Sequence, residues 1–245
     1  MQDNPDPEIT QQQLMNLFGK EEELDKELAA WIDEDSHLKH PLVYSIFHHP
    51  IKNAHVNQYF QYKKRAVAEA RNSQEWTKYI YLHERPYRVD AFSSIEENLS
   101  DEQYWELLET VWTDSENIYQ NYEMWLGLLE SERPERILMT TEEFRSALTM
   151  PTGEGGFAGE LTIFRGYQED PEYYDRPGME GLSWTLNIEK AVWFARRLQF
   201  GGRTPMLATA KVQRDDIIAF IMSREESEII ANPEHLIIEK VQDLS

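Results

Sequence analysis

The chain has 245 residues, enough for one large domain or two small ones with a sizeable core. It contains no cysteine, which excludes disulfides and thiolate metal sites. The net charge of −21, from 24 basic and 45 acidic residues, favours solubility and argues against non-specific nucleic-acid binding by the whole surface.

No apolar run reaches the roughly 18 residues that a membrane-spanning helix needs. The first residues, 1–16, are polar and acidic, unlike a signal peptide. We therefore expect a soluble cytoplasmic protein with no membrane partner.

Glycine use changes sharply along the chain. Nine of the 11 glycines lie between Gly153 and Gly202, and residues 1–150 contain only Gly19 and Gly127. Because glycine weakens helices and serves turns, this favours an α+β chain with a helical region at 1–150 and a β-rich region at 151–245. The sequence leaves the boundary open, including the alternative of one compact domain.

Helical spacing appears first at 21–33, where the apolar positions are Leu24, Leu28, Trp31 and Ile32. Ser100 with Gln103 forms a capping-box pattern before a second stripe: Tyr104, Leu107, Leu108, Val111 and Trp112. Asp114 is expected to cap a third helix, with the stripe Ile118, Tyr122, Trp125 and Leu129. Thr140 with Glu143 predicts a short helix that ends before Pro151.

Residues 36–68 form a basic, aromatic-rich island in this acidic chain. They hold no Asp or Glu, five of the seven histidines and five cations, Lys39, Lys52, Lys63, Lys64 and Arg65. One interpretation is a contact surface for an anionic partner. The other, which we favour, is aromatic and histidine packing in a helical core. No acidic residue accompanies His48, His49 and His55, so we expect no metal.

Residues 161–167 predict a strand with Leu161, Ile163, Arg165 and Tyr167 on one face. An arginine among apolar neighbours is costly unless it has an anionic partner, although an edge-strand arginine can reach water. Residues 181–186 predict a second strand with Ser183 and Thr185 on one face, and Asn187 is expected to cap the helix that follows.

The rest of the chain reads as further strands, at 206–212, 217–222, 226–231 and 236–241. A Gly-Gly loop at 199–205 holds Phe200 and Arg203. Glu226 and Glu228 share a face at the mouth of an apolar strand, so they are candidates for charge stabilisation or acid–base catalysis. A polar turn entering a strand gives the same pattern.

Three of these elements stand in a set order: Phe164-Arg165-Gly166, Ser183-Trp184-Thr185 before a helix, and Glu226-Ser227-Glu228 entering a strand. This order resembles the arginine–serine–glutamate class of mono-ADP-ribosyltransferases, which includes bacterial toxins and phage enzymes. The resemblance covers residues 160–232 and reaches the preceding helices by pattern. It implies a split, mainly antiparallel sheet that uses NAD as substrate and requires no metal.

The resemblance also implies roles for the matching residues. Arg165 would anchor the NAD phosphates and nicotinamide ribose, and Gly166 would present its backbone to the nicotinamide amide. Ser183 would orient the catalytic Glu228, while Glu226 would face the acceptor.

Looser matches complete the expected NAD site. Thr185 would line it, and Phe200 and Arg203 would serve as the phosphate–nicotinamide loop. Residues 221–227 resemble the turn-turn loop that meets the acceptor. The usual Ser-Thr-Ser is Ser-Trp-Thr here, so we expect Trp184 to point to the opposite face.

The residue types suit this chemistry. A fixed carboxylate stabilises the cation-like sugar that forms as the nicotinamide bond breaks. Arginine offers a planar fork for phosphate oxygens, and a second carboxylate accepts a proton from the acceptor. No G-x-G-x-x-G opens a helix, which argues against a Rossmann dehydrogenase.

We therefore expect an NAD-dependent mono-ADP-ribosyltransferase acting on a macromolecular acceptor, with a protein arginine as first choice and RNA or DNA as second. By analogy with the family, it would be a toxin or a phage–host conflict effector, with an antitoxin or inhibitor protein as a partner. Two alternatives stay open. One is a non-catalytic NAD or ADP-ribose binding module, and the other is a helical interaction protein.

Overall fold

The computed structural model describes residues 22–116, 118–134, 159–169, 178–197, 202–221 and 227–245. The chain divides into two compact units, Met1–Glu97 with Asp114–Glu116, and Asn98–Thr113 with Asn117–Ser245. This division differs from the expected boundary near residue 150, because the helices after Asn98 group with the sheet. None of the described helices is long and apolar enough to cross a membrane.

The first unit is mainly helical, with a small hairpin. Its elements are α2 (Lys26–Ala29), β1 (Leu38–His40), β2 (Val43–Ser45), η1 (Pro50–Lys52), α3 (Asn53–Asn72), α4 (Trp76–Leu82), η2 (Arg85–Tyr87) and α5 (Arg88–Ser93), before η3 (Glu96–Asn98). One buried cluster holds the hairpin to α2 and α3: Leu28, Leu38, Leu42, Val43 and Phe60. The expectation of a mainly helical region did not include this hairpin.

The helix expected at 21–33 is much shorter in the structure. Asp33 explains where the chain turns, because its Oδ1 accepts hydrogen bonds from the backbone N–H groups of Asp35 (3.0 Å) and His37 (2.8 Å). Ser36 takes a positive φ of 63° within this turn. These side-chain hydrogen bonds fix a turn between α2, which ends at Ala29, and the strand β1.

The second unit opens with helices α6 (Asp101–Asp114), η4 (Ile118–Asn121) and α7 (Tyr122–Leu129). The capping box is confirmed, since Ser100 N–H donates to Gln103 Oε1 (3.2 Å) and Gln103 N–H donates to Ser100 Oγ (3.3 Å). The predicted cap at Asp114 is wrong. Asp114 ends α6 and pairs with Arg88, and Asn121 precedes α7.

Six strands form the sheet of the second unit: β3 (Glu160–Glu169), β4 (Ser183–Thr185), β5 (Thr204–Gln213), β6 (Ile217–Ile221), β7 (Glu228–Ala231) and β8 (Ile237–Asp243). Their order is β6-β7-β4-β3-β5-β8, and every pairing is antiparallel. Short 3₁₀ turns lie between them at η6 (Gly178–Glu180), η7 (Arg214–Asp216) and η8 (Pro233–His235). The α+β class is thus confirmed.

The expectation of a sheet split in two is corrected to a single sheet with a narrow joint. β3 pairs with β5 along its whole length, whereas it meets β4 only at Phe164↔Thr185. β4 is only three residues long. All three of its residues pair with β7, whereas only Thr185 pairs with β3. Side chains from both halves share one core, including Ile163, Trp184 and Ile229.

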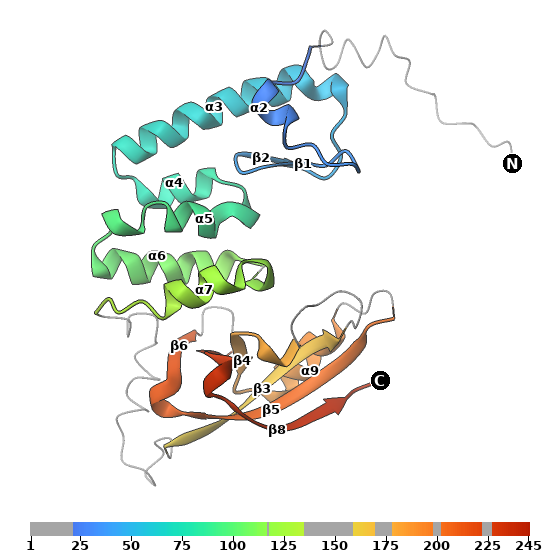
Figure 1. Ribbon diagram of the computed structural model, residues 1–245, viewed down its shortest axis with the longest axis vertical. Helices are drawn as coiled ribbons and strands as arrows, with labels where there is room; N and C mark the ends of the chain where they lie inside the picture. The colour runs from blue at the N-terminus through green and yellow to red at the C-terminus, as the bar shows by residue number, and fades with distance from the viewer. Residues whose placement is uncertain (1–21, 117, 135–158, 170–177, 198–201, 222–226) are drawn as a thin grey trace, which may run out of the picture. The chain divides into compact units, whose positions relative to one another are not determined.

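Helix α9 (Ile188–Arg196) packs on β3 and β5 (Figure 1). Asn187 caps it as expected, because its side chain accepts from the N–H groups of Glu189 (2.8 Å) and Lys190 (3.2 Å). A Cβ added to Gly166 would lie 1.7 Å from the Ala191 carbonyl oxygen. Only glycine permits this close approach of helix and strand.

Candidate active site

Strand register brings Ser183 and Glu228 together. In the β4–β7 ladder Thr185 lies opposite Glu228, and Ser183 lies opposite Ile230. Ser183 and Glu228 are thus diagonal neighbours on one face of the sheet. The Ser183 hydroxyl donates a hydrogen bond to Glu228 Oε1, and both side chains keep part of their surface exposed. Trp184 points into the apolar core on the opposite face, as expected.

A second donor reaches the same carboxylate oxygen. The indole Nε1–H of Trp112, on α6, donates to Glu228 Oε1 over 3.2 Å. Sequence reasoning assigned Trp112 only to a buried helical stripe. Its 3% exposure agrees with that, but the polar edge of the ring has this further role. The two residues lie 116 positions apart, and no local pattern links them.

Arg165 lies in the interior of the sheet, because β3 is flanked by β4 and β5. Its alternative interpretation as an edge-strand arginine is therefore wrong. The guanidinium donates from Nε to the Gly178 carbonyl (2.7 Å) and from Nη1 to the Ser183 carbonyl (2.5 Å). A Cβ on Gly181 would lie 2.0 Å from Nη2, so a larger residue there would displace the guanidinium.

Burial lowers the pKa of Arg165 to about 10, and the negative charge of Glu228 opposes that shift. The side chain therefore stays cationic at neutral pH. Of its five N–H donors, two bond to backbone carbonyls and three make no hydrogen bond to the described residues. A partly buried cation with spare donors next to a carboxylate suits recognition of an anionic group.

The other predicted site residues that the structure describes lie at separate places around the sheet. Thr185 is buried, and its hydroxyl accepts from the Asn187 N–H (3.0 Å), which ties β4 to the start of α9. Gly166 lies beneath α9, as its close approach to Ala191 requires. Arg203 immediately precedes Thr204, which pairs with Glu169 at the end of β3. It is therefore placed away from the Phe164↔Thr185 joint.

Glu226 and Phe200 lie outside the described residues, as does most of the predicted acceptor loop at 221–227. Of that loop, Ser227 is described and has a positive φ of 47°. For a residue other than glycine, this conformation costs on the order of 1–3 kcal/mol. Its carbonyl accepts from the Leu186 N–H (3.1 Å), so the strained residue is fixed immediately before Glu228.

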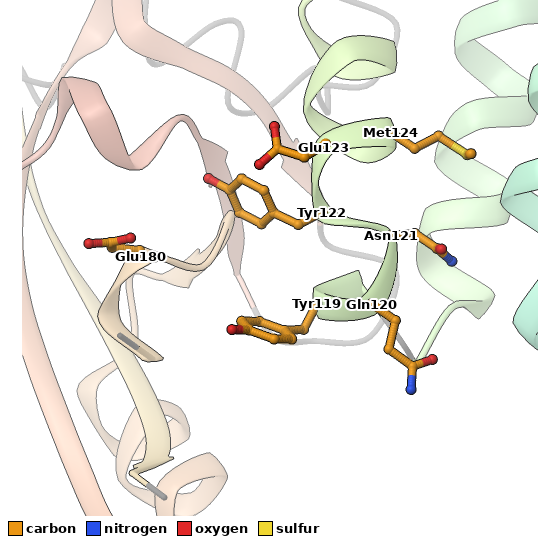
Figure 2. A pocket seen from close by; sticks show the side chains of 7 residues that line it. All are labelled: Tyr119, Gln120, Asn121, Tyr122, Glu123, Met124 and Glu180. Atoms are coloured by element: carbon orange, nitrogen blue, oxygen red, sulfur yellow. The ribbon is translucent and has the colours of Figure 1, made fainter. Parts of the chain in front are cut away.

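A pocket of about 610 Å³ lies in the same unit, between the segment 119–124 and the turn η6. Figure 2 shows the rings of Tyr119 and Tyr122 directed toward the turn η6, which carries Glu180. The same turn supplies the Gly178 carbonyl that Arg165 contacts, and Tyr122 contributes to the electrostatic environment of Arg165. The volume falls within the range of small-molecule sites, roughly 300–1,000 Å³.

The basic island at 36–68 is less cationic than its sequence indicates. Lys39 pairs with Asp33 (2.7 Å), Lys64 pairs with Glu27 (2.5 Å), and Lys63 donates to the Leu82 carbonyl (2.6 Å). The carboxylates come from outside the island, where a count of its own residues cannot find them. The aromatic residues of the island fall into a buried and an exposed group. Phe60 is buried, whereas four others are exposed: Tyr44, Phe47, Tyr59 and Tyr62.

Among the described residues, Asp33, Asp35 and His37 place ligand atoms close enough for a cation. The turn hydrogen bonds and the Lys39 pair already account for Asp33. The histidines His48, His49 and His55 do not belong to this group. His49 instead caps η1, where its Nδ1 accepts from the Ile51 N–H (3.2 Å).

Chemically, the cluster of Arg165, Ser183 and Glu228 joins a fixed carboxylate to a partly buried cation at one narrow joint of the sheet. Such a carboxylate can stabilise a developing positive charge, and the cation can hold phosphate oxygens. Scans against protein-family models, curated proteins and solved structures found no match to this chain.

Proposed function

We propose that the chain is a mono-ADP-ribosyltransferase, an enzyme that moves ADP-ribose from NAD to a macromolecular acceptor. The observation that carries the proposal is the Ser183–Glu228 hydrogen bond, formed by neighbouring strands next to the partly buried Arg165. These three residues are the ones that the sequence resemblance singled out. Their convergence from three separate segments supports a common site.

In this proposal each residue has a separate task. Glu228 stabilises the cation-like ribose as nicotinamide leaves, and Ser183 holds its carboxylate. The donors of Arg165 that do not bond to Gly178 and Ser183 contact the NAD phosphates. Glu226 would take the proton of the acceptor, as the family resemblance implies. No metal enters any of these steps.

The pocket next to η6 supports the proposal because it offers room for a small-molecule substrate, and η6 also supplies the Gly178 carbonyl that Arg165 contacts. It is lined by Tyr119, Gln120, Asn121, Tyr122, Glu123, Met124 and Glu180. Tyrosine rings provide stacking surfaces for flat rings such as those of a dinucleotide. We place part of the NAD molecule here, with its phosphates toward Arg165.

The acceptor remains a protein arginine by first choice. The net charge of −21 suits a basic protein target and repels nucleic acid. Ion pairs of Lys39 and Lys64 weaken the case for the island at 36–68 as a nucleic-acid groove. Its exposed aromatic residues keep RNA or DNA as the second choice.

The biological setting follows from the resemblance alone. We propose a cytoplasmic toxin or a phage–host conflict effector, controlled by an antitoxin or inhibitor protein.

A second candidate is a non-catalytic module that binds NAD or ADP-ribose. The hydrogen bonds from Arg165 to two backbone carbonyls favour it, because they give the arginine a structural task that needs no reaction. A helical interaction protein is the third alternative, and it would not bind NAD.

Incubation with NAD distinguishes these three candidate functions. The enzyme releases nicotinamide, the module binds NAD in calorimetry without releasing nicotinamide, and the interaction protein does neither. With NAD labelled in its adenylate part and a cell lysate, the label should survive nuclease and disappear with protease. Label that follows nucleic acid, and that falls in a salt-sensitive way when Lys63, Lys64 and Arg65 become Ala, would overturn the choice of arginine.

A further inference from the structure

Two hydrogen-bond donors from different layers of the second unit converge on one oxygen of Glu228. The Ser183 hydroxyl comes from the neighbouring strand, and the Trp112 indole comes from helix α6. A serine hydroxyl rotates freely, whereas an indole N–H is fixed by the plane of its ring. The orientation of the Glu228 carboxylate therefore depends in part on where α6 holds Trp112.

Trp112 is itself held firmly. Its ring packs edge-on against Trp125 of α7, with centroids 5.1 Å apart and an interplanar angle of 88°. The Tyr104 hydroxyl donates to the Leu128 carbonyl (2.8 Å), which ties α6 to α7 a second time. The capping box of Ser100 and Gln103 fixes the beginning of α6.

The same two helices also hold the far end of β7. Asn232, directly after the strand, donates from Nδ2 to Glu130 Oε1 (2.6 Å) at the end of α7. The helices thus contact β7 at Glu228, its first residue, and next to Ala231, its last. This arrangement acts as a frame that keeps the strand and its carboxylate in register.

We propose that Trp112 is a positioning residue for Glu228, acting through its indole N–H. It does not touch the substrate, and its effect on turnover rests on the proposed function of Glu228. Two donors on Oε1 fix the rotation of the carboxylate before NAD binds. A carboxylate held this way does not need to reorient when the sugar cation forms, so no free energy is lost to reorganisation.

The hydrogen bond itself is testable without any activity. Indole N–H signals in a proton–nitrogen NMR spectrum resolve the tryptophans, and Trp112→Phe identifies the signal of Trp112. Glu228→Gln should move this signal upfield, since a neutral amide oxygen accepts a weaker hydrogen bond than a carboxylate. Glu239→Gln, the same change at an exposed site on β8, should leave it unmoved. A Trp112 signal that ignores Glu228→Gln overturns the proposal.

The effect on turnover has a matched control in the same stacked pair. The Trp125 Nε1–H is buried and makes no hydrogen bond among the described residues. Trp112→Phe should lower kcat for nicotinamide release by roughly tenfold while leaving the KM for NAD unchanged, the loss of one hydrogen bond to a charged group. Trp125→Phe should keep the parental kcat. Equal losses of kcat in both variants would assign Trp112 a packing role only.

The two experiments keep separate failures apart. One outcome is that the Trp112 signal responds to Glu228→Gln while the parent protein releases no nicotinamide. In that case the hydrogen bond is confirmed, but the proposed function is wrong, and so is a positioning role in that reaction. If nicotinamide is released and Trp112→Phe behaves as its control, the enzyme stands and the positioning role is overturned.

Discussion

The side chain of Arg165 has two tasks: it bonds to the backbone of neighbouring segments, and in the proposed function it binds the NAD phosphates. Its Nε and Nη1 groups hold the carbonyls of Gly178 and Ser183, which join η6 and β4 to β3. Its cationic charge persists because the pKa stays at about 10 despite burial. The guanidinium is well suited to this double task, since it offers five donors in a rigid plane.

We predict that Arg165→Lys weakens both stability and NAD binding. A lysine ammonium lacks the planar fork, so at least one buried carbonyl loses its donor, which costs about 1–3 kcal/mol. Urea denaturation measures the first effect and calorimetry with NAD the second. Arg196→Lys, at an exposed arginine of α9 that also donates to a carbonyl, is the matched control. Unchanged stability and affinity in Arg165→Lys would refute both tasks.

At this scale the sequence predicts the strand-borne residues but not their helical partner. The motif order that resembles the arginine–serine–glutamate class singles out Arg165, Ser183 and Glu228, and period-two alternation adds which neighbours share a face of each strand. The role of Trp112 could not be predicted, because a buried tryptophan gives the same helical pattern whether or not its N–H has a partner. Hydrogen bonds between distant segments leave no local pattern.

Among the elements, the contact of α9 with β3 determines where the first site strand lies. Helix and strand approach so closely at Gly166 that any side chain there would collide with the Ala191 backbone. Gln168 also donates to the Ala195 carbonyl (3.2 Å) in the next turn of the helix.

We predict that Gly166→Ala destabilises the protein by about 1–3 kcal/mol, the usual cost of overpacking. The midpoint of urea unfolding should fall accordingly, and nicotinamide release should fall because β3 shifts. Gly127→Ala provides the control, since a Cβ there meets nothing within 4 Å in helix α7. That change should be neutral or stabilise the helix by up to roughly 1 kcal/mol. Equal stability of the two variants would contradict the close packing at Gly166.

Element types and their caps were largely predictable, and the exceptions have local causes. The capping box at Ser100 and the cap at Asn187 were identified because few residues accept from a free helix N-terminus. The β1–β2 hairpin was missed because the turn that Asp33 fixes with side-chain hydrogen bonds falls inside the region predicted to be mainly helical. The narrow joint at Phe164↔Thr185 depends on pairing between distant strands, which alternation alone does not determine.

On the scale of the whole molecule, one partly buried histidine links the stability of the protein to pH. The first unit contains His83, whose Nδ1 lies 2.8 Å from the Tyr79 carbonyl oxygen. Burial lowers the pKa of His83, and the nearby cations Lys63 and Arg88 lower it further. The native state therefore binds this proton less readily than the unfolded state.

We predict that stability falls as the pH drops below the ordinary histidine pKa of about 6.5. Above that value His83 is neutral in both states and costs nothing; below it the unfolded chain gains a proton that the native state resists. Unfolding midpoints at about pH 7.5 and about pH 5.5 measure the effect. His83→Asn keeps a donor for Tyr79 and cannot titrate, so its midpoints should differ less. An equal pH dependence in both proteins would refute the role of His83.

The proposed chemistry concentrates on Glu228, so the rate of nicotinamide release from NAD is the most direct test. Glu228→Gln keeps the shape and removes the charge that stabilises the sugar cation. We expect its rate to fall by ~10²–10³, the usual loss for one such stabilising group. Glu239→Gln, the same substitution at an exposed position of β8, should match the parent. Nicotinamide release by Glu228→Gln at the parental rate would contradict the assignment of this site.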